Sequence, residues 1–235
     1  MALAQRFAEI LADTGVSHGL IGPREVPRLW ERHLLNCAVI APAFRAGPVI
    51  DVGSGGGLPG VVLAIVRADL DLHLVEPMLR RTTWLQSVVD ELALTNVTIH
   101  RGRAEEYAGR LAAPAVTARA VARLDQLARW CAPLLERDGV LIAMKGRSAS
   151  QELESDRPAL IAMGLRSAVV VEHGGDAVTA GLLEEPVLTV DLTFEQRPAR
   201  ASSPQGERGG NRASGRARDG ARGQVRGQAR RRAKG

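Results

Sequence analysis

The residues best suited to chemistry lie in the segment Val49–Gly60, which reads VIDVGSGGGLPG. Five of the nine residues after Asp51 are glycine. Glycines that follow a buried strand permit a tight turn and let a ligand approach the backbone closely. Gly55, Gly57 and Gly60 fit the pattern G-x-G-x-x-G of dinucleotide sites, and a second register, D-x-G-x-G-x-G, begins at Asp51.

The charge of Asp51 distinguishes the two registers. A carboxylate two positions before the first glycine repels a diphosphate and attracts the ammonium group of an amino-acid ligand. No G-K-[ST] follows the turn, which excludes a P-loop. The segment therefore favours a ligand with a positive charge, although a glycine-rich turn without any ligand remains an alternative.

Two further acids follow the next two predicted strands. Glu76 ends the second strand, where a carboxylate can accept hydrogen bonds from both ribose hydroxyls of a nucleoside. Glu105 follows the third strand, where it can face an adenine edge. The alternatives are a solvated acid at a strand end for Glu76 and an acid at a helix start for Glu105. Three acids beside one glycine turn indicate S-adenosylmethionine, a cationic nucleoside without phosphate.

The elements that must position these residues alternate between strand and helix from residue 46 onward. Strands are expected at 48–53, 70–77, 96–102, 115–121, 139–146, 167–174 and 186–196, and helices at 58–68, 78–92, 124–135 and 148–163, with 102–111 mostly helical. The two late strands are close in sequence and suggest an antiparallel hairpin. The pattern predicts a doubly wound α/β fold with a seven-stranded, mostly parallel sheet.

The two ends of the chain differ from this α/β region, 46–197. Residues 1–45 read as an N-terminal helical cap, in which Trp30 and His33 fall at helical spacing with apolar neighbours. Like Trp84 and Trp130, Trp30 is expected in the core.

Residues 198–235 are rich in Arg and Gly, lack apolar periodicity and are expected to be a disordered tail. Positions 200–235 hold eleven basic residues against two acidic ones, whereas positions 1–199 carry a net charge of −4. The tail is interpreted as an electrostatic RNA tether, with a solubilising extension as the alternative.

Composition limits the remaining classes of function. The two cysteines, Cys37 and Cys131, lie far apart without metal-ligand spacing, so reduced thiols and no metal site are expected. No basic leader or apolar run of about 20 residues is present, so we expect a cytoplasmic protein without a membrane span.

Five motifs, in this order, give the chain a recognisable signature. They are RHLLNCAVIAP, VIDVGSGGGLPG, GRAEEY, TARAVARLDQL and MKG. Together they resemble the glucose-inhibited division protein B family of 16S ribosomal RNA guanine-N7 methyltransferases, over roughly residues 20–195. The resemblance implies a Rossmann-like class I methyltransferase fold, S-adenosylmethionine as methyl donor and a guanine near the decoding region as target.

The resemblance also assigns residues by motif. The implied cofactor contacts are Gly53, Leu58, Ala104, Glu105 and Arg119. Asp51 and Glu76 join them from the spacing argument above.

The expected chemistry needs no catalytic residue. Guanine N7 has an exposed lone pair and no proton, so catalysis is expected to be alignment with the methyl group. Arg119, Arg123, Lys145 and Arg147 lie near the carboxyl ends of the fourth and fifth strands and are candidate contacts to 16S ribosomal RNA, together with His33. Solvated cations and a structural histidine are the alternatives, and nothing demands more than a monomer.

Two other functions stay open from sequence alone. One is an NAD-dependent oxidoreductase, which the charge of Asp51 and the lack of a Tyr-x-x-x-Lys motif disfavour. The other is a non-catalytic RNA-binding protein whose basic tail carries the activity.

Overall fold

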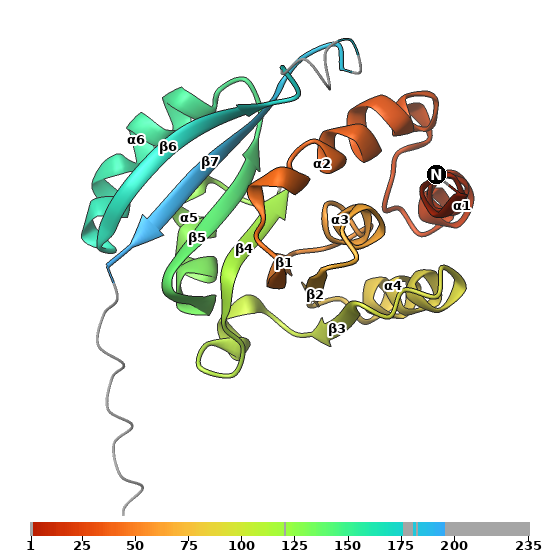
Figure 1. Cartoon of the computed structure of the whole chain (residues 1–235), viewed down its shortest axis with the longest axis horizontal. Helices are drawn as coiled ribbons and strands as arrows, with labels where there is room; N and C mark the ends of the chain where they lie inside the picture. The colour runs from red at the N-terminus through yellow and green to blue at the C-terminus, as the bar shows by residue number, and fades with distance from the viewer. Residues whose placement is uncertain (1, 120, 176–180, 182, 196–235) are drawn as a thin grey trace, which may run out of the picture. The chain divides into compact units, whose positions relative to one another are not determined.

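A single seven-stranded sheet organises the chain (Figure 1). The computed structural model describes residues 2–119, 121–175, 181 and 183–195; the predicted tail, 198–235, lies outside them. The strands are β1 (Gly47–Val52), β2 (Leu70–Glu76), β3 (Val97–Arg101), β4 (Ala113–Arg119), β5 (Leu135–Lys145), β6 (Leu165–His173) and β7 (Val187–Phe194).

The strand order is β3-β2-β1-β4-β5-β7-β6. Strands β1 to β5 pair in parallel, while β7 runs antiparallel to both β5 and β6. The predicted mostly parallel sheet and the predicted terminal hairpin are both confirmed. Because β1 and β4 are adjacent although β2 and β3 intervene in sequence, the strand order reverses at β1, which is where open α/β sheets bind ligands.

Successive residues of a strand point to opposite faces of the sheet, and each face has its own hydrophobic core. Val49 belongs to the core with α3 (Gly60–Val66) and α4 (Leu79–Glu91). Its neighbour Ile50 belongs to the core with α5 (Leu124–Cys131) and α6 (Ala149–Ala162). The helices therefore form two layers around the sheet (Figure 1).

The N-terminal residues are helical, as predicted, but they form several short segments of different helix types. The segments are α1 (Ala2–Ile10), a π-helical turn (Leu11–Gly15), a 3-10 helix (Pro23–Arg28), a π-helix (Leu29–Leu35), α2 (Asn36–Ala38) and a 3-10 turn (Ala41–Ala43). Their apolar residues share the core of α3 and α4. We name residues 23–38 the N-terminal helical segment.

The π-helical turns overturn one prediction in this segment. Trp30 was expected in the core, but its side chain is 43% exposed, whereas Leu29, Leu34 and Cys37 are buried. A π-helix has more residues per turn than an α-helix, so the buried face runs from Leu29 to Leu34 and leaves Trp30 outside. Trp84 is buried as expected, and Trp130 is partly buried.

A second correction concerns residues 102–111. The expected helix is a single 3-10 turn, Ala104–Tyr107. Ala108 leaves the helical region with a ψ of 122°, and Gly109 then takes a φ of +76°, a left-handed conformation that turns the chain away. Two absences hold for the part of the chain that the structure describes: no helix is long and apolar enough to span a membrane, and no three His, Cys, Asp or Glu side chains gather as a metal site.

Candidate functional site

The glycine turn joins β1 to α3 at the carboxyl edge of the sheet. Gly53 has a φ of +73°, and a Cβ at this position would lie 2.8 Å from Cγ2 of Val121. A side chain at Gly53 would therefore be strained by the backbone conformation and would force the Val121 side chain to shift. Leu58, also predicted from the family motif, is half-buried and packs against the core of α3 and α4. The turn therefore combines backbone without side chains at its glycines with one apolar residue, Leu58, that packs into the core.

Asp51 joins the two ends of this turn by a hydrogen bond. Its carboxylate is fully buried, and Oδ2 accepts a hydrogen bond of 3.0 Å from the backbone N–H of Gly60. Burial raises the pKa of Asp51 to about 7, and the Gly60 hydrogen bond opposes that shift. The second oxygen, Oδ1, is buried without a hydrogen-bond partner among the described residues. Asp51 thus shapes the turn, and its predicted effect on the charge of a ligand stays a prediction.

Glu76 lies at the end of β2, beside the same turn. Its Oε2 accepts a hydrogen bond of 3.1 Å from the N–H of Gly55, and its Oε1 accepts one of 3.0 Å from the N–H of Met78. The side chain is nearly buried and held by two backbone donors, so its orientation is fixed. Each oxygen keeps a second lone pair, which leaves Glu76 able to accept two hydroxyl groups.

Arg81 is a member of this site that the sequence analysis missed. Its Nη1 lies 3.5 Å from Oε2 of Glu76, and its Nε is buried without a hydrogen-bond partner in the described structure. Arg80 and Arg81 both lie on the first turn of α4, but Arg80 is exposed, whereas Arg81 is partly buried beside Glu76. No local pattern in the sequence separates the two arginines.

Ala104 and Glu105 occupy the 3-10 turn after β3. Ala104 is buried, whereas Glu105 is exposed. Since β1, β2 and β3 are parallel neighbours, the residues after each strand lie along one edge of the sheet. The structure therefore brings Asp51, Glu76 and Glu105 to the same edge, as the sequence predicted.

Arg119, at the end of β4, is engaged by the N-terminal helical segment. Its Nη2 donates to the carbonyl of Arg32 at 3.0 Å and lies 3.0 Å from Nδ1 of His33. Its Nη1 lies 3.2 Å from Sγ of Cys37. Arg119 therefore joins the helical segment to the sheet, and its predicted cofactor contact stays a prediction.

His33 lies between Arg119 and Glu25. Its Nε2 is 3.0 Å from Oε2 of Glu25. Burial lowers the pKa of His33, the positive charge of Arg119 lowers it further, and the hydrogen bond to Glu25 opposes both effects. The lowered pKa favours a neutral imidazole, in which Nδ1 accepts from Arg119 and Nε2 donates to Glu25.

The remaining predicted RNA contacts are all paired with acids. Lys145 Nζ lies 2.7 Å from Oε1 of Glu152, and Arg123 lies 2.5 Å from Oδ1 of Asp156. Arg147 forms an ion pair with Glu185. Asp156 and Glu185 lie 33 and 38 positions from their partners and Glu152 lies seven from Lys145. The sequence analysis identified none of these acids.

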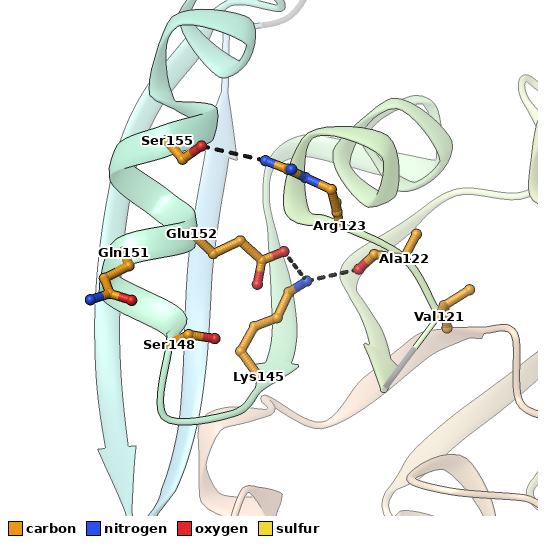
Figure 2. A pocket seen from close by; sticks show the side chains of 8 residues that line it. All are labelled: Val121, Ala122, Arg123, Lys145, Ser148, Gln151, Glu152 and Ser155. Atoms are coloured by element: carbon orange, nitrogen blue, oxygen red, sulfur yellow. Dashed lines mark hydrogen bonds and ion pairs between the residues drawn. The ribbon is translucent and has the colours of Figure 1, made fainter.

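Two cavities adjoin these cations. One, of about 750 Å³, lies between the N-terminal helical segment and the ends of β4 and β5, and His33, Arg119, Lys145 and Arg147 line it. The other, of about 600 Å³, lies between α6 and residues 121–123, and Arg123 and Lys145 line it (Figure 2). Gly53, Leu58, Glu76, Ala104 and Glu105 line neither cavity. Lys145 is common to both cavities.

The site fits S-adenosylmethionine in three respects. The turn offers bare backbone for a close ligand, and Glu76 offers two oriented acceptors. Asp51 and Arg81 hold a buried acceptor and a buried donor that have no partner among the described residues. The described residues of the turn include no P-loop lysine, and the one cation beside it, Arg81, faces the carboxylate of Glu76. The arrangement thus suits a cationic nucleoside.

The sheet order and the glycine site define a class I methyltransferase fold, and solved structures share it. A Methanococcus maripaludis protein assigned as an S-adenosyl-L-methionine-dependent methyltransferase matches with a TM-score of 0.55 and 12% identity, covering 83% of this chain and 94% of that one. Fibrillarin from Aeropyrum pernix, solved with S-adenosyl-L-methionine, matches with a TM-score of 0.50 and 18% identity, covering 68% and 74%.

Sequence comparison identifies the family. The family model of rRNA small subunit methyltransferase G (GidB) matches residues 1–178. A protein of that name from Thermobifida fusca is 51% identical over 87% of each chain, and one from Streptomyces coelicolor is 54% identical over 76% of this chain and 75% of its own. This chain belongs to the rRNA small subunit methyltransferase G family, which confirms the resemblance in its motifs.

Proposed function

We propose that this chain transfers a methyl group from S-adenosylmethionine to N7 of one guanine in 16S ribosomal RNA, near the decoding region. The observation that carries the proposal is the glycine turn with Glu76 oriented beside it, in a chain of this family. Relatives at about 50% identity are named ribosomal RNA small subunit methyltransferases, which supports the substrate class. The choice of N7 and of the decoding region follows from the family resemblance.

The chain's own residues account for binding. When bound, S-adenosylmethionine supplies an electrophilic methyl group on a sulfonium. Glu76 accepts from the ribose hydroxyls through its two remaining lone pairs, and Glu105 faces the adenine. The backbone of Gly53 and its neighbours accepts the methionine end, where a side chain would collide with Val121.

Catalysis in this proposal is alignment. The lone pair of guanine N7 forms the new bond to carbon as the carbon–sulfur bond breaks, so no proton moves and no general base is required. The protein contributes by holding the two reactants in line and excluding water, which raises their effective concentration. Of the acids at this edge, Asp51 is buried and Glu76 is oriented by backbone N–H groups, whereas Glu105 is exposed.

RNA is proposed to bind at the larger of the two cavities. Arg28 and Arg147 reach its rim, where exposed ion pairs with Glu184 and Glu185 hold them. Exposed ion pairs contribute little stability, so RNA phosphates can replace the glutamates at small cost. Lys145 and His33 line the same cavity and are proposed to face the RNA as well.

The basic tail, 198–235, is proposed to add a salt-sensitive attraction to RNA. We also propose that the protein acts in the cytoplasm as a monomer. Both proposals rest on sequence and on the ribosomal substrate.

Calorimetry and a transfer assay test the function against its two alternatives. Titration with S-adenosylmethionine is expected to give one site, and titration with NAD none. Labelled methyl is then expected to appear on small ribosomal subunits that lack their N7 modification. Binding of NAD instead would support the oxidoreductase, and cofactor binding without transfer to any ribosomal RNA would support a non-catalytic RNA-binding protein.

A further inference from the structure

Helix α6 carries two carboxylates one turn apart, Glu152 and Asp156. They occupy positions i and i+4 and therefore face the same side of the helix. That side packs against α5 and the residues before it, as Figure 2 shows for Glu152. Asp156 is 5% exposed, so its charge is held in an almost buried position.

These carboxylates cap a different helix. The first N–H groups of an α-helix have no partner within the helix, and α5 has no side-chain cap of its own at Arg123. Instead, the N–H of Leu124 donates to Oε1 of Glu152 at 2.7 Å, and the N–H of Asp125 donates to Oδ2 of Asp156 at 3.1 Å. Two acids from α6 therefore fix where α5 begins.

The same carboxylates hold the cations at the sheet edge. Oε1 of Glu152 also accepts from Lys145 Nζ at 2.7 Å, and Lys145 donates in turn to the carbonyl of Ala122 at 2.9 Å (Figure 2). Oδ1 of Asp156 accepts from Arg123 at 2.5 Å. The Lys145 side chain is only 10% exposed and Asp156 only 5%, so these two members are shielded from solvent, whereas the Arg123 side chain is 68% exposed.

The network reaches the glycine turn. Residues 121–123 follow β4, and Val121 lies against Gly53 so closely that a Cβ there would be 2.8 Å from Cγ2. Glu152 holds Ala122 through Lys145, and Asp156 holds Arg123 directly. The position of residues 121–123 over the turn therefore depends on two side chains of α6.

We propose that Glu152 and Asp156 are positioning residues for methyl transfer, which act without touching either substrate. They hold Lys145 and residues 121–123 in register with the glycine turn. The inference rests on the proposed function for its effect on turnover. The contact itself can be tested without any methyl transfer.

The first test measures how well Lys145 is held. The chain contains two lysines, Lys145 and Lys234, so acetylation by an amine-reactive ester can be followed by mass spectrometry with Lys234 as the internal reference. Glu152→Gln is expected to raise the acetylation rate of Lys145 relative to Lys234 by about fivefold, because the charged partner is lost. The matched control is Glu154→Gln, an exposed acid on the same helix that pairs with Arg157. Equal rates in the two variants would overturn the proposal.

The second test separates positioning from stability. Glu152→Gln is expected to lower kcat on small subunits by about tenfold with the Kd for S-adenosylmethionine unchanged. Because Glu152 acts in part through Lys145, adding Glu152→Gln to Lys145→Ala is expected to slow the reaction by clearly less than the roughly tenfold loss of the single Glu152→Gln variant. The proposal would be overturned if the two single losses of kcat multiplied in the double variant. A Glu152→Gln variant as fast as Glu154→Gln would also overturn it.

Asp156→Asn covers the case in which Glu152→Gln does not fold. It removes the charge beside Arg123 while keeping a similar shape, and the same loss of kcat is expected. Unchanged kcat in a folded Asp156→Asn variant would contradict the proposal. If the wild-type chain transfers no methyl group, the proposed function fails, while the acetylation comparison still decides whether Glu152 holds Lys145.

Discussion

Asp51 accepts a hydrogen bond from the backbone N–H of Gly60 across the glycine turn, with Oδ2 and N 3.0 Å apart. A Cβ at Gly60 would lie 2.7 Å from that oxygen and would also collide with Leu74. The first acid and the last glycine of the motif are therefore required by the same contact. The spacing between Asp51 and Gly60 therefore reflects the hydrogen bond that holds the turn as well as a ligand site.

Asp51 makes the stability of the protein depend on pH. Its pKa is raised from 3.8 to about 7, so between these values the folded state binds more protons than the unfolded chain. Stability contributed by this group is therefore highest near pH 4 and falls as pH rises to about 7. Relative to Asp51→Asn, the wild type is expected to lose up to about 4 kcal/mol across this window. Urea unfolding of both proteins from pH 4.5 to 7.5 measures the difference, and parallel curves would contradict it.

Gly53→Ala is expected to weaken S-adenosylmethionine binding by at least about tenfold, because alanine disfavours a positive φ and its Cβ meets Val121. Adding Val121→Ala removes the collision and is expected to restore part of the affinity. Gly22→Ala is the matched control, since its φ is −70° and its nearest neighbour is 4.0 Å away. Calorimetry measures the affinity of all three variants for S-adenosylmethionine. Equal affinities for Gly53→Ala and Gly22→Ala would refute a close approach of the ligand to the backbone at Gly53.

Arg81→Ala is expected to weaken S-adenosylmethionine binding by about fivefold or more, because a charged donor beside Glu76 is lost. Arg80→Ala, one residue earlier on α4 and exposed, is expected to bind as the wild type does. The same calorimetric titration compares the two variants. A similar loss in both would mean that general charge, not the contact with Glu76, is responsible.

Arg119→Ala is expected to lower the free energy of unfolding by about 2–4 kcal/mol, because partners on the N-terminal helical segment lose a charged donor. Amide hydrogen exchange in residues 29–38 is expected to become faster. Arg137→Ala, at an exposed position of β5, is the control. An Arg119→Ala variant of normal stability that binds S-adenosylmethionine weakly would favour the direct cofactor contact instead.

The residues at the carboxyl edge of the sheet could be predicted because the local sequence indicates where each strand ends. Apolar runs that end at Asp51 and Glu76 place both acids at the carboxyl edge once the strands are parallel. The orientation of each carboxylate was not predictable. It depends on backbone N–H groups of Gly55 and Gly60, whose directions follow from the folded turn.

The ion pairs of Lys145 and Arg123 show a different limit of prediction from sequence. Spacing placed Lys145 and Arg123 at the same edge, but not the acids that hold them. Asp156 lies 33 positions from Arg123 in sequence, on a helix whose packing against α5 only the tertiary structure defines. The error at Trp30 has a similar cause, since helical spacing assumes a regular α-helix and the segment is a π-helix.

The most direct test of the central claim is to locate the transferred methyl group. Small subunits lacking their N7 modification are incubated with the full chain and labelled S-adenosylmethionine, and the labelled nucleotide is mapped. The account predicts label at N7 of a single guanine near the decoding region of 16S ribosomal RNA. Label on another nucleotide, or on another atom of that guanine, would contradict it.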